Sequence, residues 1–466
     1  MFSSIRSTLR DKEMMRTIFR LAWPTVMEQA LQTIVQYADT AQVGAIGANA
    51  SASVGLTATM MWLINSPMFA YAMGVLSVIS RSLGAGDEKR VRKAASQSVL
   101  ITLVLGISIG IVTLIISPFL PGWLGAEQEI QRDASIYFAI VCAPMLFRAS
   151  SIVFGSVLRA TGNTKTPMII NTIMNAANII LNFLLINPAK VWQIGPLSIP
   201  MWGAGLGVTG AAIATAAAYV IGGTLMAIVT FRDPQLQLAH QKIRFDKEVM
   251  GQCVRIGTPV CAERVTACLG QVVFTALIAK LGTIAIAAHS IAITAEQAFY
   301  IPGYGMQAAA ATLAGHSAGA GDERKLRQYS ATITAIAVLL MGMLSILLFI
   351  FPAAVMGIFT HDTQVITLGA EVLRIVAVSE PFFAALIILE GIFNGIGDTK
   401  FPFFFSLFSM WGVRILFTFL CISVWGLGLQ AVWCCMIGDN MTRFVCLLVR
   451  YLRGSWKKEL GFSTKG

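Results

Sequence analysis

Polar side chains that can bind a cation occur inside long apolar segments of this sequence. Asp39 follows an apolar stretch that begins near residue 17, and a carboxylate in such a segment can bind a cation or carry a proton. The alternative is a solvated aspartate at a helix end. Four asparagines, spaced four, three and four residues apart, share one face of a helix expected over 166–187: Asn171, Asn175, Asn178 and Asn182. Their amides can join helices by hydrogen bonds, or their oxygens can coordinate a hard cation.

Ionisable residues in the other apolar segments are further candidates for residues that line a cavity or stabilise the packing. They are Glu28, Glu263, His289, Glu296, Glu380 and Glu390. Glu28 and Glu263 each follow a proline by four residues, which indicates a shared structural role. Asp439 and Arg443 are four residues apart and can pair on one helix face.

The sequence carries no signature of an enzyme. The eight cysteines lie in or beside apolar segments, without the spacing of a zinc site or a CxxC motif. The GxxxxGK[ST] loop of ATP-driven pumps is missing as well. We therefore predict a protein that is not an enzyme and that holds no cofactor.

The elements that must position these residues are membrane-spanning helices. Of the 466 residues, 56% are hydrophobic and only 12% are charged, with a mean hydropathy of +0.73. This composition excludes a large soluble protein and a disordered chain. Apolar runs long enough to cross a bilayer recur along the chain. They cover residues 17–42, 52–80, 94–120, 133–158, 166–187, 203–231, 248–281, 285–315, 328–353, 364–396, 401–424 and 428–452.

The basic residues indicate an orientation. The net charge is +11, and the lysines and arginines gather in alternate connections and at both ends of the chain. With both termini in the cytoplasm, the outside loops hold only Arg132 and Lys190. This asymmetry predicts a multi-pass membrane protein with an even number of spans and cytoplasmic N- and C-termini.

The chain also repeats itself at a shift of 235 residues. GAGDE at residue 84 recurs at residue 319, and GNTK at residue 162 recurs as GDTK at residue 397. Pro24 and Pro67 match Pro259 and Pro302. We predict an all-α membrane protein of twelve transmembrane helices in two six-helix lobes, residues 1–240 and 241–466, with a longer loop near 188–202 in the first. Alternating access suits two such lobes.

Several strings resemble the MATE (multidrug and toxic compound extrusion) family, and their wording is closest to its DinF-like prokaryotic branch. They are LAWPTVMEQALQTIVQYADTAQVGAIG, SRSLGAGDEKRVRKAASQ, AGHSAGAGDERKLRQ and FNGIGDTKFP. The resemblance implies a secondary transporter in the plasma (inner) membrane that exports organic cations or amphipathic drugs in exchange for protons or sodium.

The resemblance also implies site residues. Asp39 would couple ion and substrate binding, and Asn178 and Asn182 would complete a cation site in the N-terminal lobe. Thr215 matches a further ligand. Asn182 stands where the family often has an acidic residue, which removes a charge from a sodium site.

Position 39 corresponds at the 235-residue shift to Phe274, position 178 to Val413 and position 182 to Phe417, so the second half lacks this polar set. We therefore expect the ion site in the N-terminal lobe. The alternatives are a lipid-linked saccharide flippase of related architecture and a non-transporting receptor or scaffold. The expected partners are a small-molecule substrate and membrane lipid, with no nucleic acid, and a monomer is sufficient.

Overall fold

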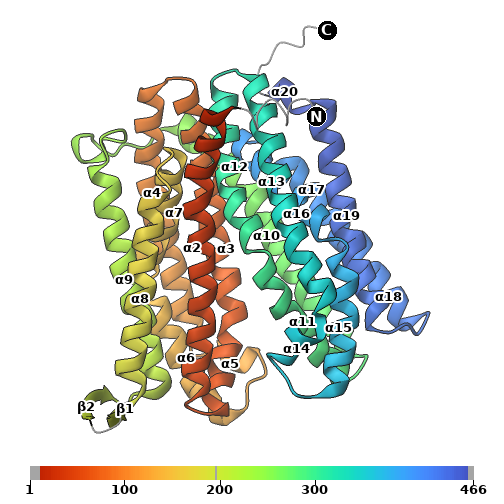
Figure 1. Ribbon diagram of the computed structural model, residues 1–466. Helices are drawn as coiled ribbons and strands as arrows, with labels where there is room; N and C mark the ends of the chain where they lie inside the picture. The colour runs from red at the N-terminus through yellow and green to blue at the C-terminus, as the bar shows by residue number, and fades with distance from the viewer. Residues whose placement is uncertain (1–10, 195–196, 460–466) are drawn as a thin grey trace. The chain divides into compact units, whose positions relative to one another are not determined.

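The computed structural model describes residues 11–194 and 197–459, which are almost entirely helical (Figure 1). The chain forms two compact units. Unit 1 contains the described parts of Met1–Gln29, Leu76–Asp87 and Gln252–Gly466, and unit 2 contains Ala30–Val75 and Glu88–Gly251. Helices α2 and α3 therefore contribute to both units. The lobe boundary between residues 240 and 241 stays a prediction.

The helices of the first half follow one another with short connections. They are α2 (Lys12–Gly44), α3 (Ala48–Gly84), α4 (Glu88–Ile116), α5 (Leu120–Trp123), α6 (Gln128–Cys142), α7 (Met145–Ala160), α8 (Lys165–Ile186), α9 (Gly207–Arg232) and the 3₁₀ turn η1 (Leu238–His240).

The second half contains the corresponding series. It comprises α10 (Lys247–Ala279), α11 (Thr283–Phe299), α12 (Ile301–Gly319), α13 (Glu323–Ile350), α14 (Pro352–Gly357), α15 (Thr363–Ala377), α16 (Glu380–Ile396), α17 (Lys400–Phe408), the π-helix η2 (Ser409–Ile415), α18 (Leu416–Ser423), α19 (Leu429–Arg453) and α20 (Trp456–Glu459).

The helix bounds carry the sequence repeat. A shift of 235 residues places α2 on α10 and α6 on α15 with identical ends, and it places α3 on the pair α11 and α12. This agreement supports the predicted fold of two repeated halves. Asp322 also has the structural role expected of the GAGDE loop, because its side chain caps α13 by accepting a hydrogen bond from the Lys325 backbone N–H over 2.8 Å.

Three of the expected spans are broken. Eight helices are long and apolar enough to cross a membrane, and three bent pairs raise the number to eleven. The bends are 50° between α6 and α7, 49° between α11 and α12, and 59° between α15 and α16. Helix α2 is also long enough at 33 residues, but it is more polar. Pro302 and Pro381 lie in the first turns after two of the breaks, where a proline has no helical N–H to lose.

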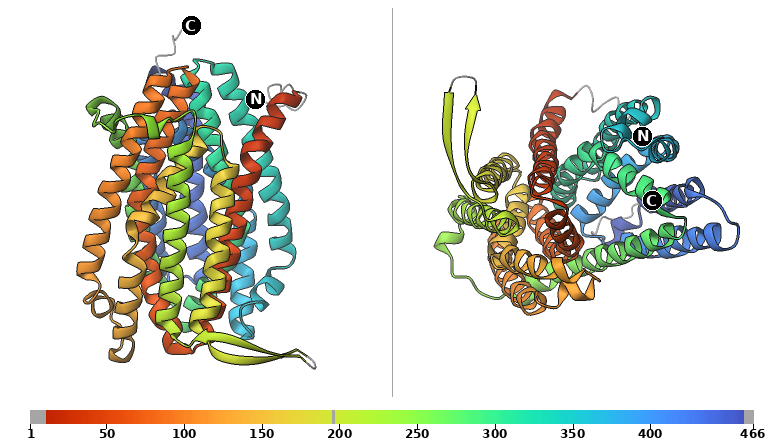
Figure 2. Two further views of the ribbon diagram at one scale, coloured as in Figure 1. Left: turned by 90° about the vertical axis from the view of Figure 1, so that its left-hand side faces the viewer. Right: turned by 90° about the horizontal axis from the view of Figure 1, so that it is seen from below.

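The segment expected as a loop near 188–202 is instead a β-hairpin. Strands β1 (Pro188–Ile194) and β2 (Leu197–Ala204) pair antiparallel, with Val191 opposite Pro200. Figure 2 shows the hairpin running away from the ends of α8 and α9. The expected span 203–231 is therefore too long at its start, because residues 203 and 204 belong to β2. β-branched and aromatic residues favour a strand here.

Unit 1 is held together by closely packed small residues. The last turns of α3 pack on α12 and α16, where the Ser77 hydroxyl donates to the Gly395 carbonyl over 2.9 Å. Ala309, Ala310 and Ala314 of α12 are buried in the same core. Small side chains let backbones approach, which is how membrane helices gain packing energy.

Unit 2 contains an apolar core and an apolar outer face. Met68, Phe138 and Met145 are fully buried in its core. On α4, by contrast, Leu103, Ile107, Ile111 and Ile115 are exposed. An exposed apolar face on a helix of this length is what a lipid environment requires, so the chain is a multi-pass membrane protein.

Candidate functional site

The residues predicted to bind a cation in the first half lie together in unit 2. Asn182 of α8 donates a hydrogen bond from Nδ2 to Asp39 Oδ1 over 2.6 Å. The Asn178 amide fits its neighbours when its nitrogen faces Asp39. It then donates to Oδ1 over 2.7 Å, and its oxygen accepts a hydrogen bond from Thr215 Oγ1 over 3.3 Å. The carboxylate on α2, two amides on α8 and the hydroxyl on α9 thus form one network.

Burial gives this network its chemical character. Asn178 and Asn182 are 5% and 1% exposed, and Asp39 is half-buried. The Asn182 Oδ1 atom is buried and has no hydrogen-bond partner in the part of the chain that the structure describes. A buried amide oxygen with free lone pairs beside a carboxylate is a ligand pair suited to a hard cation.

The other two asparagines of the predicted stripe stand apart from the centre of the network. Asn175 and Asn171 lie about one and two helical turns before Asn178 on α8, and both are only half-buried. The equal spacing in the sequence therefore conceals two different environments. Burial increases from Asn171 toward Asn182.

Two tyrosines and an arginine beside this network were not found from the sequence. Tyr137 of α6 shares a hydrogen bond with Thr215 and interacts electrostatically with Asp39 and Tyr219. The Arg148 guanidinium of α7 lies 4.7 Å from the centre of the Tyr219 ring. A tyrosine in an apolar helix gives no signal that separates a site from a core, but Arg148 is a charge inside an expected span and was detectable.

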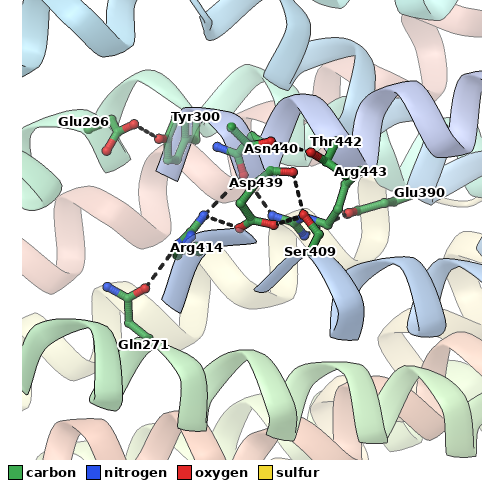
Figure 3. Close-up of polar contacts among 11 residues, drawn as sticks. Gln271, Glu296, Tyr300, Glu390, Ser409, Arg414, Asp439, Asn440, Thr442 and Arg443 are labelled. Atoms are coloured by element: carbon green, nitrogen blue, oxygen red, sulfur yellow. Dashed lines mark hydrogen bonds and ion pairs between the residues drawn. The ribbon is translucent and has the colours of Figure 1, made fainter. Parts of the chain in front are cut away.

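The second half contains a different polar cluster, drawn in Figure 3. Asp439 of α19 is fully buried and pairs with two arginines. Its distance is 2.7 Å from Oδ2 to Arg414 Nη2 and 3.4 Å from Oδ1 to Arg443 Nε. Arg443 also reaches Glu390 Oε1 over 3.5 Å. The predicted pairing of Asp439 with Arg443 is confirmed, and Arg414 is an addition.

Arg414 owes its position to the π-helix η2. Its guanidinium donates to Asn440 Oδ1 over 3.3 Å and lies 5.5 Å from the centre of the Phe274 ring. It also donates to Gln271 Oε1 over 3.5 Å. Phe274 is the repeat counterpart of Asp39. Where the first half has an acidic residue open to a cation, the second half therefore places a cation of its own.

The remaining candidates lie in unit 1. His289 is buried with its ring edge-on to Phe274 and Trp433, at centroid distances of 5.6 and 5.8 Å. Glu296 is buried and accepts a hydrogen bond from the Tyr300 hydroxyl. The carboxyl-bearing residues Glu28 on α2 and Glu263 on α10 are half-buried. These groups belong to a different unit from the Asp39 network.

Known proteins resemble the chain over almost all of its length. The probable multidrug resistance protein NorM of Thermotoga maritima is 28% identical over 446 residues, which are 96% of this chain and 94% of that protein. The uncharacterized transporter YisQ of Bacillus subtilis is 26% identical and covers 94% of each chain.

Solved structures show the same fold. A crystal structure of MATE in complex with MaD3S has a TM-score of 0.84 and 23% identity, and covers 96% of this chain and 97% of that one. A MOP superfamily transporter from Pyrococcus furiosus has a TM-score of 0.85 and 23% identity, and covers 95% and 96%. The MatE profile matches twice, over residues 24–184 and 259–420. Because these two matches span most of the chain, the chain belongs to the MATE family of transporters.

Proposed function

We propose that this protein is a secondary active antiporter of the plasma membrane that exports organic cations or amphipathic drugs in exchange for protons or sodium. Multidrug resistance proteins among its relatives support the substrate class. The observation that carries the proposal is the Asp39 network, in which an amide oxygen of Asn182 is buried without a partner beside a carboxylate.

The network offers a simple basis for exchange. Asp39 has one negative charge, and its Oδ1 atom already accepts hydrogen bonds from two amides. A proton on the carboxyl, a sodium ion among the oxygens and a cationic substrate nearby all draw on that same charge. In a site of low dielectric constant a second positive charge is repelled strongly, so occupancy by one disfavours the others.

The second half supports a location in the first half. Its equivalent place is lined by Phe274 and holds the Arg414 guanidinium, which pairs with Asp439. A tethered cation there leaves no unpaired carboxylate for a free ion. The proposed ligands for a coupling ion are therefore Asp39, Asn178, Asn182 and Thr215.

The test is drug efflux from proteoliposomes. Purified protein is reconstituted, a fluorescent organic cation is loaded, and proton and sodium gradients are imposed separately. Wild type is compared with Asp39→Asn and with Asp133→Asn, a control that makes the same chemical change at an exposed position on α6.

We expect one gradient to drive flux in wild type and in Asp133→Asn, and Asp39→Asn to lose it. Flux driven by neither gradient would contradict the antiporter. Flux that persists in Asp39→Asn would retain the antiporter and refute the site.

A further inference from the structure

Two acidic side chains of unit 1 lie where broken helices begin or end. Glu296 is in the last turn of α11, just before the 49° bend into α12, and Glu380 is the first residue of α16, just after the 59° bend from α15. Helix α12 packs directly on α16. Discontinuous helices in transporters often form ion sites, because their ends expose polar backbone groups at membrane depth.

The two carboxyl groups face each other in a dry place. Glu296 and Glu380 are 2% and 1% exposed and lie within hydrogen-bonding reach of one another. Tyr300, at the α11–α12 break, donates its hydroxyl to Glu296 Oε1. Neither oxygen of Glu380 meets an N–H or O–H donor among the described residues. Two acceptors in contact without a donor between them are one proton short.

No cation is at hand to replace that proton. The charged and titratable groups that act on the pair are Tyr300, Tyr304 and, from η2, Arg414. Tyrosines bring no positive charge, and Arg414 is committed to Asp439 at 2.7 Å. His289 is on the same helix, but it is packed between aromatic rings. Two buried carboxylates side by side cannot both remain ionised.

A purely structural role does not explain the pair. At the 235-residue shift, Glu296 corresponds to Met61, Tyr300 to Asn65 and Glu380 to Met145. Met145 opens α7 after a bend of 50°, close to the 59° before Glu380. The bend therefore forms with an apolar side chain at the same position.

We propose that Glu296 and Glu380 form a proton-binding site in the second half, with one proton shared between the two carboxyl groups and Tyr300 completing the hydrogen-bond set. Binding adds a proton to one carboxylate, and release returns it to water. A part for this site in coupled transport rests on the antiporter function proposed above. Proton binding itself does not, and it can be measured without substrate.

The experiment is infrared difference spectroscopy of the full-length protein between acidic and neutral pH. All variants are made in an Asp39→Asn background, so that this carboxyl does not contribute. Glu296→Gln and Glu380→Gln each test one partner. Glu371→Gln is the matched control, because Glu371 is exposed on α15 and bonds to Gln430 over 2.7 Å.

We expect a carbonyl band of a buried protonated carboxyl in the parent and in Glu371→Gln, and its loss in either of the other two variants. A glutamine amide supplies the missing donor, so the remaining glutamate no longer needs the proton. If a glutamine variant does not fold, Glu296→Met and Glu380→Met introduce the residues of the first half and are expected to lack the band too.

A band of unchanged size in the folded variants would overturn the proposal, as would a parent without the band. Failure of drug efflux leaves this result untouched, so the two proposals can fail separately.

Discussion

The crossing of α3 and α12 leads to a quantitative prediction about two glycines. A Cβ atom added to Gly84 would lie 2.0 Å from the carbonyl oxygen of His316, and one added to Gly319 would lie 1.9 Å from that of Arg81. The shift of 235 residues relates Gly84 to Gly319 and Arg81 to His316. The same contact thus occurs twice, in the manner of a twofold interface within one chain.

The geometry fixes the size of the effect. A carbon normally approaches a carbonyl oxygen to about 3.3–3.6 Å, so an alanine at either position must push the two helices apart by more than 1 Å. Both obstructing atoms belong to the backbone and cannot rotate away. Overpacking of this kind costs about 1–3 kcal/mol. We expect Gly84→Ala and Gly319→Ala each to lower the free energy of unfolding by about 2–3 kcal/mol.

The pair also predicts non-additivity. Once one alanine has separated α3 from α12, the second meets less resistance, so the double variant should lose clearly less than the sum of the two single losses. Two independent sites would instead give additive losses.

The assay is unfolding in mixed micelles with increasing SDS, followed through labelling of the buried thiol of Cys253. Gly55→Ala is the control, because Gly55 is also in α3 and its added Cβ would meet no atom within 4 Å. A helical alanine there should be neutral or stabilising by up to about 1 kcal/mol. Equal stability of Gly84→Ala and Gly55→Ala would refute the reasoning.

Three further predictions concern polar contacts. Arg414→Gln should destabilise the protein by about 3 kcal/mol because it leaves Asp439 with one weaker partner, and Asp439→Asn should restore part of the loss in SDS unfolding; an unchanged midpoint would contradict this. Asn182→Leu should weaken cation binding about 10- to 100-fold, measured by ion-dependent drug efflux, because a hydrogen bond to a charged group is lost; wild-type ion dependence would argue against the site. The pKa of Asp246, in the connection before α10, is lowered mainly by its bond to Lys93, so the docking of residues 241–249 is complete above about pH 4 and is lost as the pH falls through the lowered pKa. Hydrogen exchange of this segment should rise at acidic pH, and Asp246→Asn should remove the pH dependence.

The helices were predictable because their signals are long and repeated. Apolar runs and the 235-residue shift located the segments that fold as helices. The three bends were not predictable, since a proline does not act in one way. Pro67 lies inside the continuous helix α3, whereas its counterpart Pro302 follows a break. The hairpin was missed because two short strands in one connection leave little periodic signal.

The site was predictable where a helix is regular. On α8, the four-residue spacing of Asn178 and Asn182 correctly places both beside Asp39. In the corresponding stretch of the second half the same reasoning points to Val413, yet Arg414 carries the contacts. A π-helix has more residues per turn and so changes which side chain faces the core, and no residue type in SMWGVRI announces it.

The two halves therefore differ in their side-chain chemistry more than in their helix bounds. Bounds repeat between α2 and α10 although Asp39 corresponds to Phe274, and a bend recurs where Met145 corresponds to Glu380. Backbone geometry at these places depends on prolines, glycines and helix length, which the halves share. Polar side chains can then differ without cost to the scaffold, provided that each buried charge finds a partner. Asp439 finds it in arginines of the chain itself, while Asp39 has only neutral donors. That difference singles out Asp39 as the carboxylate available to an ion from outside.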